Sequence, residues 1–148
     1  MATLHQGQGL ITLALFVNRC SLGLYFLLAG IAKIRSGVEA FYKGAFSSLK
    51  PMWLPDWFAM PYGHALPFVE VLLGAALLVG FYGRAAAAVT TLALASFTIA
   101  LYQAGAFIPK TGGPFHANVV FLTLAFLLAV TGPGNFSVDS FRGKSVSR

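Results

Sequence analysis

Two charged side chains, Arg19 and Glu70, lie inside long apolar runs of this sequence. A charge near the bilayer centre costs about 2.5–3.5 kcal/mol or more, so each needs a partner or a function. Arg19 shares one face of its run with Gly23, and Glu70 shares a comparable face with Gly74. Because glycine lets two helices approach closely, we predict that these faces pack together and that the opposite charges pair.

The depth of these charges in the membrane leaves the pairing open. Glu70 lies near the end of its run, while Arg19 lies about three to four helical turns from the same side, where Lys33 is an equally suitable partner. Three interpretations follow: an ion pair that only holds the helices in register, an Arg19 side chain that extends to one surface, or a polar pocket for a quinone, a substrate or a proton.

Aromatic and histidine side chains precede Glu70 in the sequence. Trp53, Trp57 and Tyr62 lie among prolines, where indole and phenol rings suit the headgroup level of a membrane. Together with His64 they would also form the mouth of a quinone pocket, which needs flat apolar walls and a few hydrogen-bonding groups. Both interpretations stay open at this point.

Several kinds of chemistry are not expected. Cys20 is the single cysteine, so the chain alone can form neither a disulfide nor a CxxC redox pair. His64 and His116 border apolar runs instead of facing each other at matched depth, which disfavours a transmembrane haem. Metal-ligand spacings and nucleotide-binding motifs are absent as well. We therefore expect no metal and no intrinsic cofactor, and we assign no catalytic residue.

Four apolar runs must position these side chains. They cover residues 10–32, 66–83, 85–108 and 115–130, and as helices they would be about 24–36 Å long, against a hydrocarbon core of about 30 Å. Inside hydrocarbon each backbone polar group must be satisfied within its own segment. The sequence therefore predicts an all-α integral membrane protein, with a four-transmembrane-helix bundle as the single domain over residues 1–148.

Composition and charge agree with a membrane protein. The chain is 57% hydrophobic and only 9% charged, and its formal net charge is +6. The basic residues lie at the ends of the runs and in the tail, where anionic lipid is a simpler partner than nucleic acid. We expect the bilayer as partner and no nucleic acid. The positive charges divide almost evenly between the two sides, so they leave the orientation open.

The segments outside the runs differ from one another. Apolar residues recur at helical spacing over residues 38–49, with Glu39 and Lys43 placed for an i,i+4 pair on the opposite face. This segment is too short to cross, so we predict a helix that lies in the interface and ends at Pro51. The first nine residues are polar and small, and we expect them to be irregular or interfacial.

Four short motifs resemble those of the DoxX family of membrane proteins. They lie at Asn18–Lys33, Pro67–Gly74, Gly80–Arg84 and Gly132–Asp139, in the order that the family has. The resemblance implies a four-helix protein of a bacterial or archaeal cell membrane. Some members of that family are the small subunit of thiosulfate:quinone oxidoreductase, and related groups assist the maturation of redox enzymes.

Two functions follow as expectations. The first is a non-catalytic membrane subunit that anchors, stabilises or helps mature a respiratory, redox or other membrane complex. The alternative is a quinone-interacting redox subunit, with Arg19 and Glu70 in its pocket and His64, Trp53 or Trp57 at its mouth. Small residues, such as the alanines of Ala85–Ala88, offer close-packing faces, so we expect a homo- or hetero-oligomer.

Overall fold

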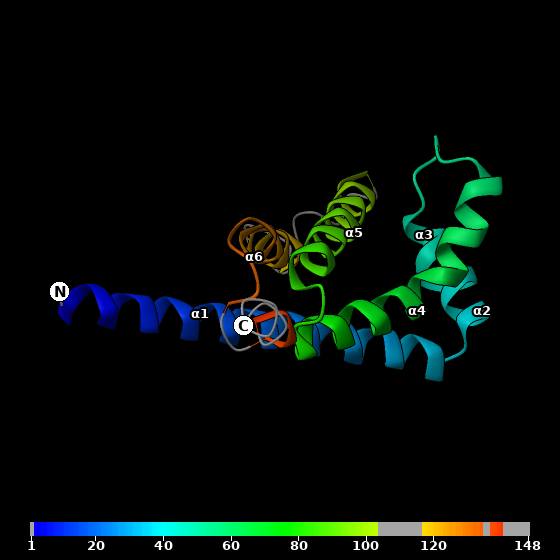
Figure 1. Cartoon of the computed structure of the whole chain (residues 1–148). Coiled ribbons are helices and arrows are strands. Elements are labelled where there is room, and N and C mark those ends of the chain that lie inside the picture. Colours follow the sequence, from blue (N-terminus) through cyan, green and yellow to red (C-terminus); the bar gives the residue numbers. More distant parts are fainter. Residues whose placement is uncertain (1, 104–116, 135–136, 141–148) are drawn as a thin grey trace.

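The computed structural model describes residues 2–103, 117–134 and 137–140, which contain helices and their connections and no strand (Figure 1). The four longer helices form two antiparallel pairs. A set of short helical pieces lies in the chain between the first and the second of these helices. The elements are α1 (Ala2–Arg35), α2 (Val38–Phe41), the π-helix η1 (Tyr42–Phe46), α3 (Ser47–Leu49), α4 (Asp56–Val79), α5 (Gly83–Gln103) and α6 (Ala117–Thr131).

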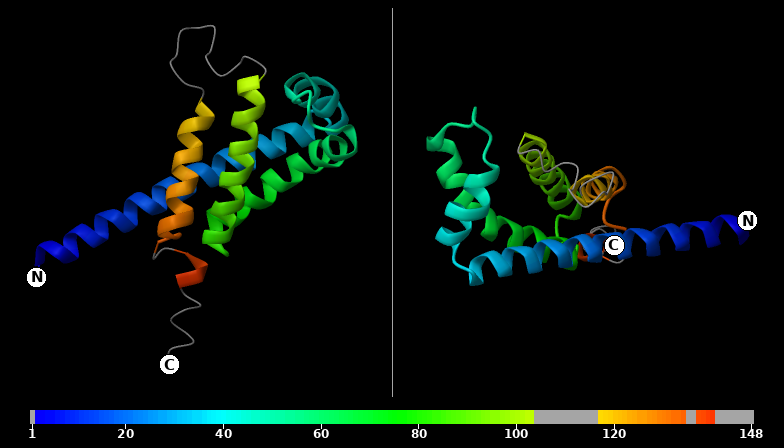
Figure 2. Two further views of the ribbon diagram at one scale, coloured as in Figure 1. Left: turned by 90° about the horizontal axis from the view of Figure 1, so that it is seen from above. Right: turned by 180° about the vertical axis from the view of Figure 1, so that it is seen from behind.

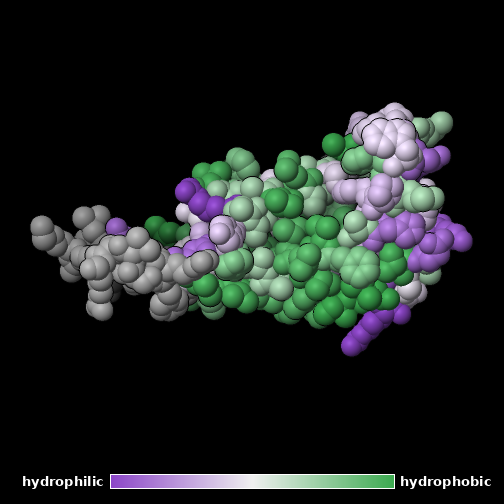
Figure 3. Space-filling view, turned by 45° about the vertical axis from the view of Figure 1, so that its right-hand side comes forward, coloured by the Kyte–Doolittle hydropathy of each residue, from purple (hydrophilic) through white to green (hydrophobic). Residues whose placement is uncertain are grey.

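The long helices confirm the expected all-helical membrane character for three helices. α1, α4 and α5 are each long and apolar enough to cross a bilayer, whereas α6 is apolar but has 15 residues, or about 22 Å. Residues 104–108 and 115–116 of the expected third and fourth spans lie outside the described residues. Figure 3 shows hydrophobic residues over the middle of the molecule and hydrophilic ones gathered toward its ends.

Two helix boundaries differ from the prediction. α1 already begins at Ala2, so of the two expectations for the first nine residues, irregular or interfacial, the irregular one was wrong; no proline interrupts the helical hydrogen bonding there. α4 begins at Asp56 instead of near residue 66 and includes Pro61 and Pro67. Tertiary packing outweighs the helix-breaking tendency of the prolines, since this part of α4 contacts the helical pieces of residues 38–49 through Gly63.

The helices pack as two pairs (Figure 2). α1 packs against α4, α5 packs against α6, and the second pair crosses the first, with the N-terminal part of α1 projecting beyond the other helices. A buried apolar core joins the two pairs. It consists of Leu22, Phe26, Leu73, Leu77, Ala86, Ala87, Leu94, Ala125 and Leu128.

Glycines hold α1 and α4 at close range, as the sequence predicted. A Cβ atom added to Gly74 would lie 2.4 Å from the backbone nitrogen of Leu27, and one added to Gly30 would lie 2.6 Å from the carbonyl oxygen of Pro67. These are backbone atoms, which cannot turn away as a flexible side chain can. Only glycine therefore allows the two helix backbones to approach this closely.

The segment after the last long helix closes the turn between α4 and α5. Gly80 ends α4 in the left-handed conformation, with φ 73°. Asp139 then accepts hydrogen bonds from the backbone N–H groups of Tyr82 (2.9 Å) and Gly83 (2.7 Å), which satisfies donors at the start of α5. The short GPG motif at Gly132 brings Asp139 to this turn, so the C-terminal motif has a structural role.

Replacement of Asp139 by Ala is expected to lower the free energy of unfolding by about 1–2 kcal/mol, because two backbone donors lose their acceptor. Asp139→Asn keeps one acceptor oxygen and should lose about half as much. Denaturant or thermal unfolding in mild detergent measures both variants. Equal stability of all three proteins would show that the carboxylate does not hold the turn.

Candidate functional site

A cavity of about 640 Å³ lies between α1, α4, α5 and the connection that contains residues 41–54. This volume falls within the range of small-molecule sites in proteins. Its walls are largely apolar and aromatic, with Phe26 from α1, Phe41 from α2, Phe58 from α4 and Phe97 from α5 among them. The long connection between α1 and α4 therefore builds one wall of a cavity instead of serving only as a linker.

An ion pair lies in the wall of this cavity. Lys33 Nζ on α1 donates a hydrogen bond to Glu70 Oε1 on α4, and the Glu70 residue is only 3% exposed. The ammonium group also lies 5.1 Å from the ring centroid of Phe41 and 5.8 Å from that of Phe97. Cation–π contacts and the carboxylate thus hold the Lys33 charge at a fixed place in the cavity wall.

Arg19 does not belong to this site, and the predicted pairing of Arg19 with Glu70 is wrong. Its Nη1 donates to the carbonyl oxygen of Pro133 over 3.1 Å and lies against Gly80, at the C-terminal end of α4. Ten residues of helix, or about 15 Å, separate Gly80 from Glu70. Glu70 instead pairs with Lys33, which on depth alone was an equally suitable partner.

The antiparallel register of the two helices explains this outcome. Gly23 of α1 lies against Gly74 of α4, and Gly30 lies against Pro67. Arg19 is one turn before Gly23, so it must face the far end of α4, while the long Lys33 side chain reaches Glu70. The glycine faces predicted the helix contact correctly, but not which charges would meet along it.

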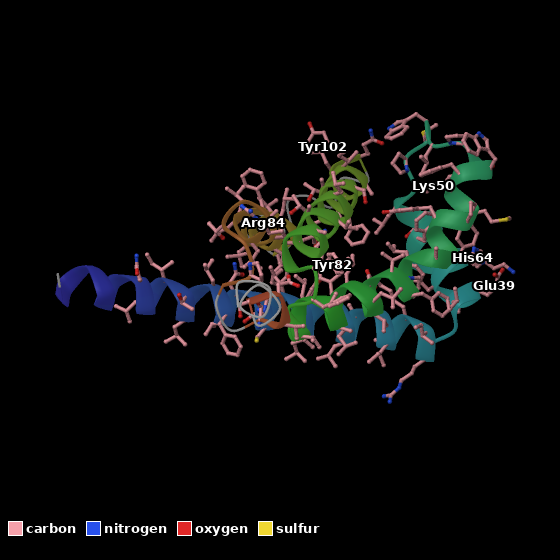
Figure 4. The ribbon with its side chains drawn as sticks, viewed as in Figure 1. Glu39, Lys50, His64, Tyr82, Arg84 and Tyr102 are labelled. Atoms are coloured by element: carbon pink, nitrogen blue, oxygen red, sulfur yellow. The ribbon has the colours of Figure 1, made fainter. Side chains whose placement is uncertain are left out.

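His64 lies outside the cavity as well. Its Nε2 is 2.8 Å from Glu39 Oε2, its Nδ1 is 2.8 Å from the carbonyl oxygen of Met60, and its ring packs on that of Tyr42. Figure 4 shows His64 and Glu39 side by side at the outer edge of the helical connection. Both ring nitrogens are engaged there, so His64 is held as part of the connection and does not line the pocket.

The two tryptophans have different positions. Trp53 lines the cavity, and its indole N–H donates to the Gln103 side-chain oxygen at the end of α5 over 2.9 Å. Trp57 does not line the cavity and is 78% exposed. Of the five candidate residues, the structure therefore brings together only Glu70 and Trp53.

Sequence reasoning missed a pair of hydroxyl groups in the cavity wall. The Tyr62 hydroxyl of α4 lies 2.7 Å from the Ser96 hydroxyl of α5, and Ser96 donates to the Ala93 carbonyl oxygen within its own helix. Tyr62 had been considered only as an interface residue or mouth of a pocket. Ser96 stands out only as a polar residue within an apolar run, which is a weak signal.

Metal and haem sites were also considered. Within the described ranges no group of three or more His, Cys, Asp and Glu side chains could hold a metal ion. His116, whose position together with that of His64 disfavoured a transmembrane haem in the sequence, lies outside the described residues.

Glu39 provides a pH-dependent contact in the helical connection, where the predicted pair with Lys43 is present at 3.0 Å. Hydrogen bonds from His64 first, and then from Lys43, hold the pKa of Glu39 below its ordinary value of 4.5. A carboxyl group with a lowered pKa stabilises the fold above its unfolded-state pKa. This contribution is lost as the pH falls through the lower pKa of the folded state.

We therefore expect Glu39→Gln to lower the thermal midpoint slightly at about pH 6, and the difference from the unchanged protein to vanish as the pH falls below about 4. The effect is small because the pair is exposed. Thermal unfolding in detergent at a series of pH values measures it. A difference that grows toward acid pH would contradict the assignment.

Together these features define a multi-pass, all-helical membrane protein with an apolar cavity and a buried ion pair. A comparison with protein-family models identifies the particular family. Residues 11–132 match the model described as methylamine utilisation protein MauE, so the chain belongs to the MauE family. No curated protein and no solved structure matches the chain significantly.

The family match corrects the resemblance to DoxX, which was wrong. Its motifs consist of glycines, single charges and a GPG turn. In this structure those residues serve close helix packing at Gly74 and the turn contacts of Asp139. Any antiparallel membrane hairpin packed through glycine can use the same residues, so such short motifs did not distinguish the two families.

Proposed function

We propose that this chain is a non-catalytic membrane accessory protein of methylamine utilisation, which helps methylamine dehydrogenase to mature. The observation that carries the proposal is the MauE match, which extends from the first long helix to the end of α6. A non-catalytic role agrees with the described polar residues, which serve mainly to join helices. Arg19 and Asp139 make contacts at one end of the bundle, and Lys33 and Glu70 join α1 to α4.

The placement in the membrane is part of this proposal. We place α1, α4, α5 and α6 across the cell membrane of a bacterium as four spans, with residues 38–49 flat in the interface. The hydrophobic middle and hydrophilic ends in Figure 3 support this arrangement. Large exposed apolar side chains on the long helices, such as Leu72 (69%) and Leu92 (70%), suit contact with lipid or with a partner subunit.

Cysteine labelling tests the interfacial position of residues 38–49. In a Cys20→Ala background, Ser47→Cys should react with a water-soluble maleimide, because Ser47 is exposed. Phe46→Cys should be protected, because Phe46 packs against Gly63 and lines the cavity. Equal reaction of both cysteines would contradict the assigned faces of this segment.

A complementation experiment tests the function. The full chain is expressed in a methylamine-using host that lacks its own MauE protein, and growth on methylamine and methylamine dehydrogenase activity are measured. We expect both to be restored, with growth on an unrelated carbon source unchanged. Membranes that contain the chain but no dehydrogenase should not oxidise methylamine. If growth is not restored although the chain is present in the membrane, the proposal is wrong.

A further inference from the structure

The cavity has a shape and lining that suit a flat apolar molecule. Aromatic rings from four different segments form its walls, including Phe26, Phe41, Phe58 and Phe97. Flat side chains on several sides favour a ring that can stack or meet ring edges, which adds to the gain from burying its apolar surface. The volume of about 640 Å³ is far larger than a one-carbon amine needs.

Hydrogen-bonding groups occur at two places in this apolar lining. Lys33 offers its ammonium group, whose side chain is 26% exposed, and Glu70 holds this group in position. Tyr62 and Ser96 offer a hydroxyl pair that joins α4 to α5. A few fixed polar groups in an otherwise apolar pocket determine how a ligand is oriented.

The charges of the lining indicate a neutral ligand. Lys33 is paired with Glu70, and Lys50, the other cation in the described lining, is paired with Asp56. A phosphate headgroup would compete with these carboxylates for both cations. A methylammonium ion is disfavoured as well, because the Lys33 ammonium already occupies the position between the Glu70 carboxylate and two aromatic rings.

We propose that this cavity binds a lipid-soluble quinone, with its ring between the aromatic walls and its carbonyl oxygens accepting hydrogen bonds from Lys33 and from the Tyr62 hydroxyl. The Tyr62 hydroxyl would turn from Ser96 to the quinone, while Ser96 keeps its hydrogen bond to the Ala93 carbonyl oxygen. A quinone combines the required properties: it is flat, neutral and apolar, and it carries oxygen acceptors on its ring. The inference concerns binding and does not depend on the proposed accessory function.

Tryptophan fluorescence tests this site, because the chain has only two tryptophans and only Trp53 lines the cavity. The probe is a benzoquinone with a ten-carbon tail, titrated into the detergent-solubilised full chain. In Trp57→Phe, where Trp53 is the reporter, quenching should saturate. In Trp53→Phe, Trp57 reports from beside the cavity-lining Phe58, so quenching should saturate over the same quinone concentrations but be less deep.

Cavity variants of Trp57→Phe locate the binding. Ala93→Phe fills the cavity from α5 and should abolish saturable quenching, whereas Ala88→Phe, on the same helix but outside the lining, should not. Lys33→Met combined with Glu70→Gln removes the charges as a pair and should weaken binding about tenfold or more. If Ala93→Phe does not fold, Tyr62→Phe tests the site in its place, and we expect its affinity for the quinone to be several-fold weaker.

Three results would overturn the proposal. One is quenching that does not saturate in Trp57→Phe, which would mean that lipid acyl chains occupy the cavity instead of a quinone. Another is deeper quenching of Trp57 than of Trp53, which would place the quinone on the outer side of α4. The third is saturable quenching that neither Ala93→Phe nor Tyr62→Phe changes, since a quinone would then bind elsewhere.

Discussion

Lys33→Met is expected to lower the free energy of unfolding by about 3–5 kcal/mol, because it leaves the Glu70 carboxylate buried without its cation. Glu70 is only 3% exposed and has a second oxygen, Oε2, that is buried without a hydrogen-bond partner among the described residues. Solvent therefore replaces only a small part of what the ammonium provides. Thermal or denaturant unfolding in mild detergent measures the change.

The chain contains a matched control for this prediction. Lys43 also pairs with a glutamate, Glu39, but the two side chains are 74% and 60% exposed. Lys43→Met should therefore change the free energy of unfolding far less than Lys33→Met does. The double variant Lys33→Met with Glu70→Gln should recover most of the stability that Lys33→Met loses, because no unpaired charge remains. Equal losses in Lys33→Met and Lys43→Met would show that burial does not make the first pair important.

Gly74→Ala is expected to lower the free energy of unfolding by about 3 kcal/mol, the upper end of the usual cost of overpacking. The added methyl group would lie 2.4 Å from the Leu27 nitrogen and 2.7 Å from the Gly23 carbonyl oxygen. Because both are backbone atoms, α1 and α4 must move apart to accept it. The loss should appear in the same unfolding measurement.

Gly9→Ala is the control for this substitution. Gly9 also lies within α1, but nothing lies within 4 Å of an added Cβ there. Alanine favours a helix over glycine by up to about 1 kcal/mol, so this variant should be as stable as the unchanged protein or slightly more stable. A similar loss in Gly9→Ala and Gly74→Ala would mean that close packing of the two helices is not what Gly74 provides.

The family match supports the proposed role in methylamine utilisation, and the proposed quinone site is argued from the cavity alone. The two proposals can fail separately. Complementation without saturable quinone quenching would support the accessory function alone. Saturable quenching by a chain that does not restore growth on methylamine would support the cavity site alone.

Four features could be predicted from the sequence: the membrane character, the helical nature of the long runs, the helical segment over residues 38–49 and the glycine contact between α1 and α4. These features follow from local physics. An apolar run in a bilayer must satisfy its backbone internally, and a glycine face can be recognised from spacing along one helix.

The tertiary structure alone decided which polar side chains meet. Arg19 and Glu70 looked like partners, but the antiparallel register of the helices carries Arg19 to Pro133 and Lys33 to Glu70. The cavity likewise depends on where the connection folds back over α4 and α5, and on the packing of these two helices, which brings Tyr62 to Ser96. Register and fold-back are relations between distant segments, and no single segment of this sequence specifies them.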